Sequence, residues 1–168
     1  FLKKYSALTG SGSDYLTSIF NFQLVRIGVP FYIHGACFNA QYALHSIPTM
    51  SFRCRFQEYS LVYSSDHNND PDVQQMLLRK GIISKSRFDQ LNSFHWDADI
   101  IFHESGMKPL HTPIDVLEKL PDDVKSRTVV YHVPKQQIAP GSLLRLAQFG
   151  IENTLVFEVS SPAFERAY

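Results

Sequence analysis

The sequence predicts an α/β fold in which helices flank a mixed β-sheet. Residues 52–57 alternate apolar and polar side chains, which is the period-two pattern of a half-buried strand. Two later apolar runs, residues 99–102 and 128–131, have the length of buried strands. Segments with helical spacing and helix-start signals lie between these strands. A chain of 168 residues is long enough for a single domain with its own core.

The composition limits the classes of partner and location. The chain is 44% hydrophobic and 19% charged with a formal net charge of zero, so it has no overall attraction to nucleic acid or anionic membranes. No apolar run has the length of a membrane span, and no secretory signal pattern opens the sequence. The two cysteines, Cys37 and Cys54, form no CxxC pair, which favours free buried thiols in a reducing compartment. We therefore expect a cytoplasmic protein.

The first part of the chain predicts two helices and two strands. Residues 1–12 have helical spacing that ends in a Gly-Ser-Gly loop, and residues 13–26 predict a short amphipathic helix against the sheet. Residues 28–30 form a turn, and residues 31–37 and 38–44 are aromatic-rich strands. His34 falls in the middle of the first strand, where a structural histidine is expected. His45 follows the second strand, which is a better position for a ligand.

Residues 43–66 are the organising stretch of the sequence. Two strands, residues 52–57 and 61–63, are separated by a tight turn, with His45 before the first and Asp66 after the second. Antiparallel strands of this kind would bring His45 and Asp66 to the same edge of the sheet. An imidazole and a carboxylate held there by strands suit a transition-metal site. The alternative is a structural histidine and a turn aspartate.

Two helices are predicted after Asp66. Asp70 can cap a helix with Pro71 in its first turn, so residues 72–80 predict a helix that ends at Gly81. A second helix is expected at residues 86–93. His67 directly follows Asp66 and could be a further ligand, a substrate contact or an ordinary loop residue. His95 stands beside Trp96 in a loop and is expected to be structural.

The last part of the chain repeats the pattern of a strand that runs into a histidine. The strand at residues 99–102 leads to His103 and Glu104, and the strand at residues 128–131 leads to His132. Between them, His111 precedes a predicted helix at residues 113–120, whose N-terminus would point N–H groups toward an anionic phosphate. A helix at residues 142–149, a stop at Gly150 and a strand at residues 154–159 complete the predicted layer.

These motifs, in this order, resemble the C-terminal half of the metallo-β-lactamase fold. The matching motifs are a His followed by Pro-Thr-x-x-Phe-Arg (residues 45–53), a Tyr-Ser-x-Asp turn (63–66), an Ala-Asp-x-x-x-His-Glu strand end (98–104), a His-Thr helix start (111–112) and a final strand-borne His132. The resemblance covers about residues 30–159 and is strongest to the phosphodiesterase branch that contains tRNase Z and cyclic-nucleotide phosphodiesterases. It implies half of an αββα sandwich, with residues 1–168 forming one C-terminal part. The two-helix connection after Asp66 resembles an insertion in that fold.

The resemblance also implies a set of roles for site residues. In that family the residues matching His45 and His132 bind metal, and the turn aspartate, here Asp66, bridges two metals. Such a dinuclear site hydrolyses a phosphodiester with a metal-bound hydroxide held between the ions. Zinc suits these ligands, with manganese or iron possible. His111 would protonate the leaving oxygen, and Glu104 would orient it.

The set of metal ligands predicted from the sequence is incomplete. The family draws its remaining ligands from an HxHxDH motif in its N-terminal half, and this motif is absent from the sequence. The chain could be the second half of a longer enzyme, could pair with a separate chain that supplies the first half, or could have lost catalysis. The first explanation is favoured because all three matched ligands are retained.

Several functions remain open at the level of sequence. The leading prediction is a metal-dependent phosphodiesterase that acts on a cyclic nucleotide or on RNA. The neutral net charge makes tRNA a less favoured substrate. A non-catalytic regulatory or binding module with the same fold is the main alternative, and thioester hydrolysis of the glyoxalase type is a third possibility. A homodimer is also possible.

Overall fold

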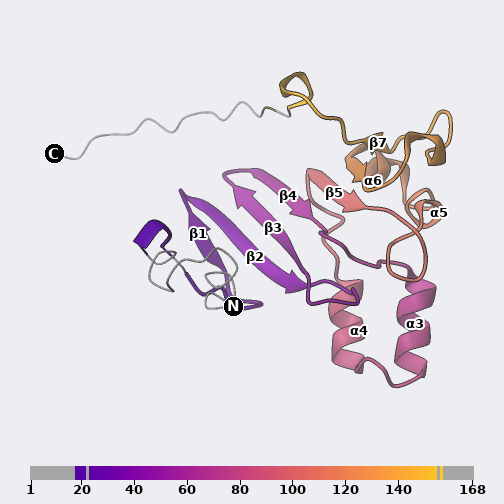
Figure 1. Ribbon diagram of the computed structural model, residues 1–168, viewed down its shortest axis with the longest axis horizontal. Helices are drawn as coiled ribbons and strands as arrows, with labels where there is room; N and C mark the ends of the chain where they lie inside the picture. Colours follow the sequence, from indigo (N-terminus) through magenta and orange to yellow (C-terminus); the bar gives the residue numbers. More distant parts are fainter. Residues whose placement is uncertain (1–17, 22, 155, 157–168) are drawn as a thin grey trace, which may run out of the picture.

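A seven-stranded mixed sheet forms the body of the protein. The computed structural model describes residues 18–21, 23–154 and 156. The strands pair in sequence order, with antiparallel pairing from β1 to β4 and parallel pairing from β4 to β7. They are β1 (Phe31–Ile33), β2 (Ala36–Tyr42), β3 (Met50–Phe56), β4 (Tyr59–Tyr63), β5 (Ile100–Glu104), β6 (Thr128–Tyr131) and β7 (Arg145–Leu146). This mixed sheet with flanking helices confirms the predicted α/β class (Figure 1).

Helices make the connections between the parallel strands. Helices α3 (Pro71–Arg79) and α4 (Lys85–Asn92) lie between β4 and β5, side by side at the lower right of Figure 1. The side chain of Asp70 accepts a hydrogen bond from the Asp72 amide and caps α3, as its sequence predicted. Helices α5 (Ile114–Leu117) and α6 (Asp122–Ser126) connect β5 to β6. Short 3-10 helices, η1 (Lys135–Gln137) and η2 (Ile151–Asn153), precede and follow β7.

One face of the central strands carries the hydrophobic core. Successive side chains of a strand point to opposite faces, so Val62, Ile101 and Val130 share one face of β4, β5 and β6. Leu117 from α5 and Val124 from α6 pack against that face. The α5–α6 connection therefore covers this side of the sheet and fixes the ends of β5 and β6.

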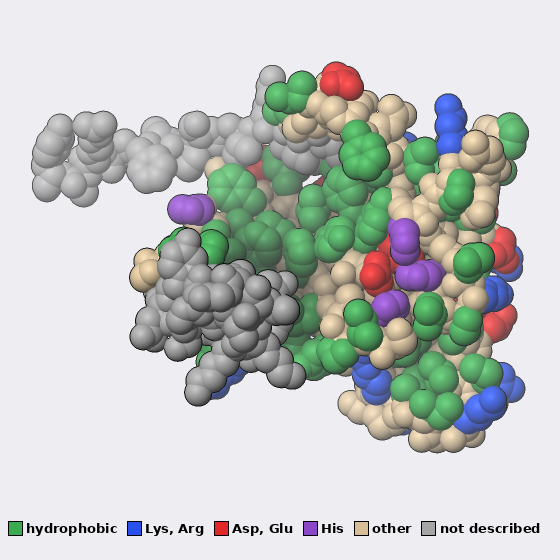
Figure 2. Space-filling model, in the orientation of Figure 1, with side chains coloured by type: hydrophobic (Ala, Val, Ile, Leu, Met, Phe, Trp, Pro, Cys, Tyr) green, Lys and Arg blue, Asp and Glu red, His purple; other side chains and the backbone are tan. Residues whose placement is uncertain are grey.

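The opposite face of the sheet carries a row of aromatic rings. The row consists of Phe31, Phe38, Phe52, Tyr63 and Tyr131, with successive ring centroids 5.4, 5.9, 5.4 and 5.4 Å apart. All five side chains remain half-buried. Figure 2 shows hydrophobic side chains gathered over the strands, beside a group of histidine and acidic side chains. This aromatic row is an apolar surface that the described part of the chain leaves partly open to solvent.

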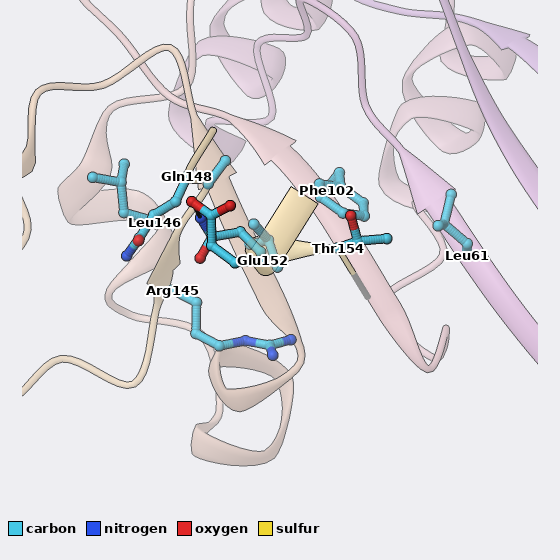
Figure 3. Close-up of a pocket in the computed structure, with 10 residues that line it drawn as sticks. Leu61, Phe102, Arg145, Leu146, Gln148, Glu152 and Thr154 are labelled. Carbon is cyan, nitrogen blue, oxygen red and sulfur yellow. Dashed lines mark hydrogen bonds between the residues drawn. The ribbon is translucent and has the colours of Figure 1, made fainter. Parts of the chain in front are cut away.

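A hollow of about 720 Å³ lies on the same face, between the central strands and the segment after β7. Figure 3 shows Leu61 and Phe102 on one side of it and Arg145 and Glu152 on the other. Val129 completes its apolar floor. The hollow extends the open apolar face toward the last strand of the sheet.

One helix prediction was wrong, and a second fails over most of the part of its range that the structure describes. Residues 142–149 contain the short strand β7 rather than a helix, because Leu144 packs into the core and Leu146 pairs with Val130 at the edge of β6. In the predicted helix at residues 13–26, only Ser18 and Ile19 are helical among the described residues, and Leu24 is 96% exposed. The helix predicted at residues 1–12 lies outside the described residues, as does most of the strand predicted at 154–159.

Smaller corrections concern turns and helix lengths. His34 lies in the turn between β1 and β2 with a φ of 47°, not within a strand, and Gly35 at a φ of 82° completes that turn. The helix predicted at residues 113–120 is the four-residue α5, followed by the separate α6, because Pro121 interrupts it. No helix in the described part of the chain has the length and apolarity needed to cross a membrane.

Candidate metal centre

The candidate site lies where three parallel strands end. Because β4, β5 and β6 run in the same direction, their carboxyl ends meet at one edge of the sheet. Asp66 follows β4, Glu104 is the last residue of β5 and His132 follows β6. The loop after β5 adds His111, and the β2–β3 connection adds His45. Five residues singled out from the sequence therefore come together at this edge.

Three of these side chains form a compact group of metal-binding atoms. One donor atom from each of Asp66, His111 and His132 lies within 4.8 Å of the others. His45 is not part of this group, but its ring centroid is 5.5 Å from that of His111. The ring of His111 in turn meets the ring of His132 edge-on at 4.8 Å. His111, predicted as a proton donor, thus lies between the two histidines that were predicted as ligands.

The carboxylate of Glu104 lies close to both histidines of this group. Its side chain is 0% exposed, and its Oε2 lies 3.0 Å from His111 Nδ1 and 3.9 Å from His132 Nδ1. The alignment at His111 falls outside that of a hydrogen bond, so these two buried atoms have no hydrogen-bond partner. Burial, with a smaller contribution from the neighbouring Asp66 carboxylate, raises the pKa of Glu104 to about 7. Unpaired buried polar atoms at one point are typical of a site that takes a ligand or ion.

The second oxygen of Glu104 is fully held by the backbone. Glu104 Oε1 accepts hydrogen bonds from the Thr112 amide at 3.1 Å and from the His67 amide at 3.3 Å. These two bonds oppose the rise in the pKa of Glu104. They also use the Thr112 amide, and α5 has only four residues. The predicted phosphate site at the start of this helix is therefore not supported.

The backbone has positive φ angles just after two of the strands that lead to site residues. Four described non-glycine residues have positive φ: His34 and Gln57 in tight turns, and Ser65 and His132 at this site. Ser65, which directly precedes Asp66, has a φ of 53°. Its carbonyl accepts hydrogen bonds from the hydroxyls of Tyr131 and Ser64. Left-handed non-glycine residues are costly and persist where surrounding contacts hold them. The predicted motif included Tyr63 and Ser64, but the role of Tyr131 had no sequence signal.

Gly106 permits the close approach of the loop that carries His111. A Cβ atom at this position would lie 3.0 Å from the Cβ and Cγ atoms of His111. Such a contact is tighter than ordinary van der Waals packing, so a larger residue would displace the imidazole. The loop is closed by hydrogen bonds from the Gly106 amide to the Thr112 carbonyl and from the His111 amide to the Met107 carbonyl.

Two buried histidines, His67 and His103, lie next to site residues in the sequence. His103 is fully buried, stacks on Trp96 with the centroids 5.4 Å apart, and its Nδ1 donates to the Glu104 carbonyl at 2.6 Å. Burial lowers the pKa of His103 to about 4 and that of His67 to about 3, with the nearby positive charges of protonated His103 and Arg87 adding to the effect on His67. Both rings are therefore neutral near pH 7. His95, as expected, is structural: Arg53 contacts it at 3.2 Å.

A broad depression lies beside the metal-binding group. It has a volume of about 840 Å³ and is lined by Asp66 and His132 together with apolar residues that include Val133, Pro134 and Phe149. In Figure 2, histidine side chains sit together with an acidic side chain at the surface. The donor atoms are thus accessible from outside, with room for a substrate next to them.

The chain is similar in sequence to known proteins. No protein-family model matches the chain. The chain is 36% identical over 167 residues to cGMP-dependent 3',5'-cGMP phosphodiesterase A of Dictyostelium discoideum, covering 99% of this chain and 19% of that protein. It is 35% identical over 159 residues to cAMP/cGMP-dependent 3',5'-cAMP/cGMP phosphodiesterase B of the same organism, covering 95% of this chain and 14% of that protein. The chain is similar to a segment of two cyclic-nucleotide phosphodiesterases. It spans less than a fifth of the length of either.

Two solved structures are also similar to the chain. The metallo-beta-lactamase fold protein YhfI from Bacillus subtilis has a TM-score of 0.40 and 10% identity, covering 66% of this chain and 42% of that protein. A Thermotoga maritima protein of the metallo-beta-lactamase superfamily has a TM-score of 0.42 and 9% identity, covering 74% and 56% of the two chains.

Proposed function

We propose that this chain supplies part of the active site of a metal-dependent phosphodiesterase that hydrolyses a cyclic nucleoside monophosphate. The observation that carries the proposal is the group formed by Asp66, His111 and His132, whose donor atoms lie within 4.8 Å of one another beside an open depression. The similarity to cyclic-nucleotide phosphodiesterases supports a cyclic nucleotide over RNA as the substrate. The absence of net positive charge agrees with this choice.

The donor set suits a transition metal. One carboxylate and two imidazoles are the ligands that zinc prefers, and manganese or iron would also accept them. We propose that Asp66, His132 and His45 hold the metal, as the motifs predicted. A bound metal would supply a Lewis acid for the phosphoryl oxygens and an activated water for the attack.

His111 and Glu104 are suited to move a proton. Since Glu104 Oε2 faces His111 Nδ1 at 3.0 Å, the other ring nitrogen, Nε2, is the one available to a substrate. In its protonated form the imidazole of His111 can donate a proton to the leaving oxygen of the ester. Glu104 orients the ring through this contact and is itself oriented by the amides of Thr112 and His67.

A second assignment makes His111 the third metal ligand in place of His45. The specific observation in its favour is that His111 belongs to the compact donor group, whereas His45 lies outside that group, with its ring centroid 5.5 Å from that of His111. The two assignments differ in what the loss of His111 would do. A proton donor affects the rate of the chemical step, and a ligand affects metal affinity.

We also propose that a further part of the same fold completes the site. Three ligands are too few for the two ions of the predicted dinuclear centre. The aromatic row forms an apolar face that would need a cover, and its half-buried rings suit a second sheet packed at about 10 Å. An N-terminal half carrying HxHxDH would supply both the cover and the remaining ligands. In this view residues 1–168 are the C-terminal part of one domain. We also propose a cytoplasmic location, which the free thiols of Cys37 and Cys54 support.

The proposal is tested by measuring metal content and cyclic-nucleotide hydrolysis in the full-length protein. His132→Ala should lose bound zinc and lower kcat/KM by about 100-fold or more. His111→Gln should keep the zinc and lower kcat by about 100- to 10,000-fold if His111 is the proton donor. His34→Ala, at an exposed turn, is the control and should match the wild type. Unchanged hydrolysis in His132→Ala would remove the assignment, and zinc loss in His111→Gln would favour the second one.

A further inference from the structure

His67 is a buried residue at the centre of the contacts that hold the candidate site. It directly follows Asp66, yet its side chain is only 3% exposed and lies against Phe94, with the ring centroids 5.7 Å apart. It is not one of the three residues of the compact donor group. A contact with substrate is therefore excluded for the folded protein, and a role as direct ligand has no support in the geometry.

The imidazole of His67 is bonded to the segment that carries His45. The Leu44 amide donates a hydrogen bond of 2.8 Å to His67 Nδ1, and the Asn68 amide donates one of 2.8 Å to the Leu44 carbonyl. These two bonds join the residue before His45 to the residues after Asp66. Because an amide can donate only to a bare nitrogen, Nδ1 of His67 carries no proton and the neutral ring holds its proton on Nε2.

The backbone of His67 is bonded to the remaining parts of the site. Its amide donates to Glu104 Oε1 at 3.3 Å, and its carbonyl accepts from the hydroxyl of Thr112 at 2.7 Å. Thr112 follows His111, so residue 67 connects the His111 loop with the end of β4. One buried residue thus contacts the neighbours of His45 and His111 as well as Glu104.

We propose that His67 is a positioning residue, whose Nδ1 sets the His45 loop against Asp66 and so fixes the distance between these two groups. The inference rests on the proposed metal site, because it concerns the donors that would hold the ion. If His67 only filled space, any side chain of similar volume would replace it. If it positions the loop, the acceptor at Nδ1 is what matters, because losing it leaves the Leu44 amide without this hydrogen-bond partner.

Two substitutions separate these readings. His67→Asn keeps an oxygen acceptor near the place of Nδ1, and His67→Phe keeps the ring and its contact with Phe94 but removes the acceptor. We expect His67→Phe to weaken zinc binding about 10- to 100-fold, as loss of a ligand-orienting contact does elsewhere. His67→Asn should stay within about threefold of the wild type. His132→Ala is included as the variant that removes a donor directly.

The experiment measures the zinc dissociation constant of the full-length protein and its variants by competition with a chelator. If His132→Ala binds zinc as the wild type does, the proposed metal site itself fails. If His132→Ala loses zinc while His67→Phe binds it as tightly as the wild type, the site stands and the positioning role of His67 is wrong. Equal weakening by His67→Asn and His67→Phe would also overturn the role, because the acceptor would then not be the cause.

A measurement on the unmodified protein covers the case in which His67→Phe does not fold. Long-range ¹H–¹⁵N spectra of histidine side chains distinguish a protonated from a bare ring nitrogen. We expect His67 Nδ1 to be bare and Nε2 to be protonated at pH 7. A proton on Nδ1 would exclude the bond from the Leu44 amide and with it the proposal.

Discussion

His103 is a buried histidine whose charge state should make the stability of the site depend on pH. Its ring is fully buried beside Trp96 and Phe94, and among the described residues the titratable ring nearest to it is that of His67, with the ring centroids 6.3 Å apart. Burial lowers its pKa from 6.5 to about 4. The folded protein therefore keeps His103 neutral at a pH where the unfolded chain would protonate it.

The sign and size of the effect follow from this difference. Between about pH 6.5 and pH 4 the unfolded state binds a proton that the folded state does not, so stability falls as the pH falls through this window. Each pH unit within it is worth about 1.4 kcal/mol, so His103 alone should cost about 2 kcal/mol between pH 7.5 and pH 5. Above about pH 6.5 it should contribute no further change.

The assay measures hydrogen exchange in peptides of the full-length protein that cover β5. Exchange rates corrected for the intrinsic rate at each pH give the free energy of local unfolding. His103→Asn can still donate to the Glu104 carbonyl but cannot be charged. Its loss of opening free energy between pH 7.5 and pH 5 should be about 2 kcal/mol smaller than that of the wild type. His67 is present in both proteins, so the difference isolates His103.

The matched control is His34→Asn, which removes an exposed histidine from the β1–β2 turn. It should keep the pH dependence of the wild type. If His103→Asn and the wild type lose the same free energy on acidification, then the buried ring is not the source of acid sensitivity and the reasoning is refuted.

Two further predictions concern the packing around the site. Gly106→Ala should lower kcat by about 10- to 100-fold, because its Cβ would lie 3.0 Å from His111 and shift the imidazole; steady-state kinetics check this, and full activity would contradict it. Leu117→Ala, which empties a fully buried position in the core, should lower the opening free energy of α5 by about 2–5 kcal/mol. The control Leu110→Ala, at a 43% exposed position, should lower the opening free energy by less than about 1 kcal/mol. If the two variants lose the same opening free energy in the hydrogen-exchange assay, the core contact of Leu117 is not the cause.

The positions of the central strands, and of Asp66 and His132 just beyond two of them, could be predicted from the sequence because the signals there are local. The alternation of Phe52 and Cys54 with arginines gave β3, and the Asp70-Pro71 cap gave the start of α3. Asp66 and His132 each follow a strand of the parallel part of the sheet, so they lie at the same edge, where the carboxyl ends of these strands meet. Such patterns depend on a few neighbouring residues and survive in the folded protein.

The parts that could not be predicted depend on contacts distant in sequence. Leu144 and Leu146 have spacings that suit either a helix or a strand, and only pairing with β6 selects the strand. The bond between Leu44 and His67 joins residues 23 positions apart, so His67 remained an open case in the sequence. The grouping of His111 with Asp66 and His132 depends likewise on the close packing of Gly106 against the His111 ring.

The most direct test of the proposed metal centre is anomalous X-ray scattering at the zinc edge from crystals of the full-length protein grown with zinc. We expect a peak about 2 Å from a carboxylate oxygen of Asp66 and a ring nitrogen of His132, with His45 or His111 as the next ligand. A zinc-loaded crystal in which the ion lies elsewhere, with Asp66 and His132 bound to no metal, would contradict the account.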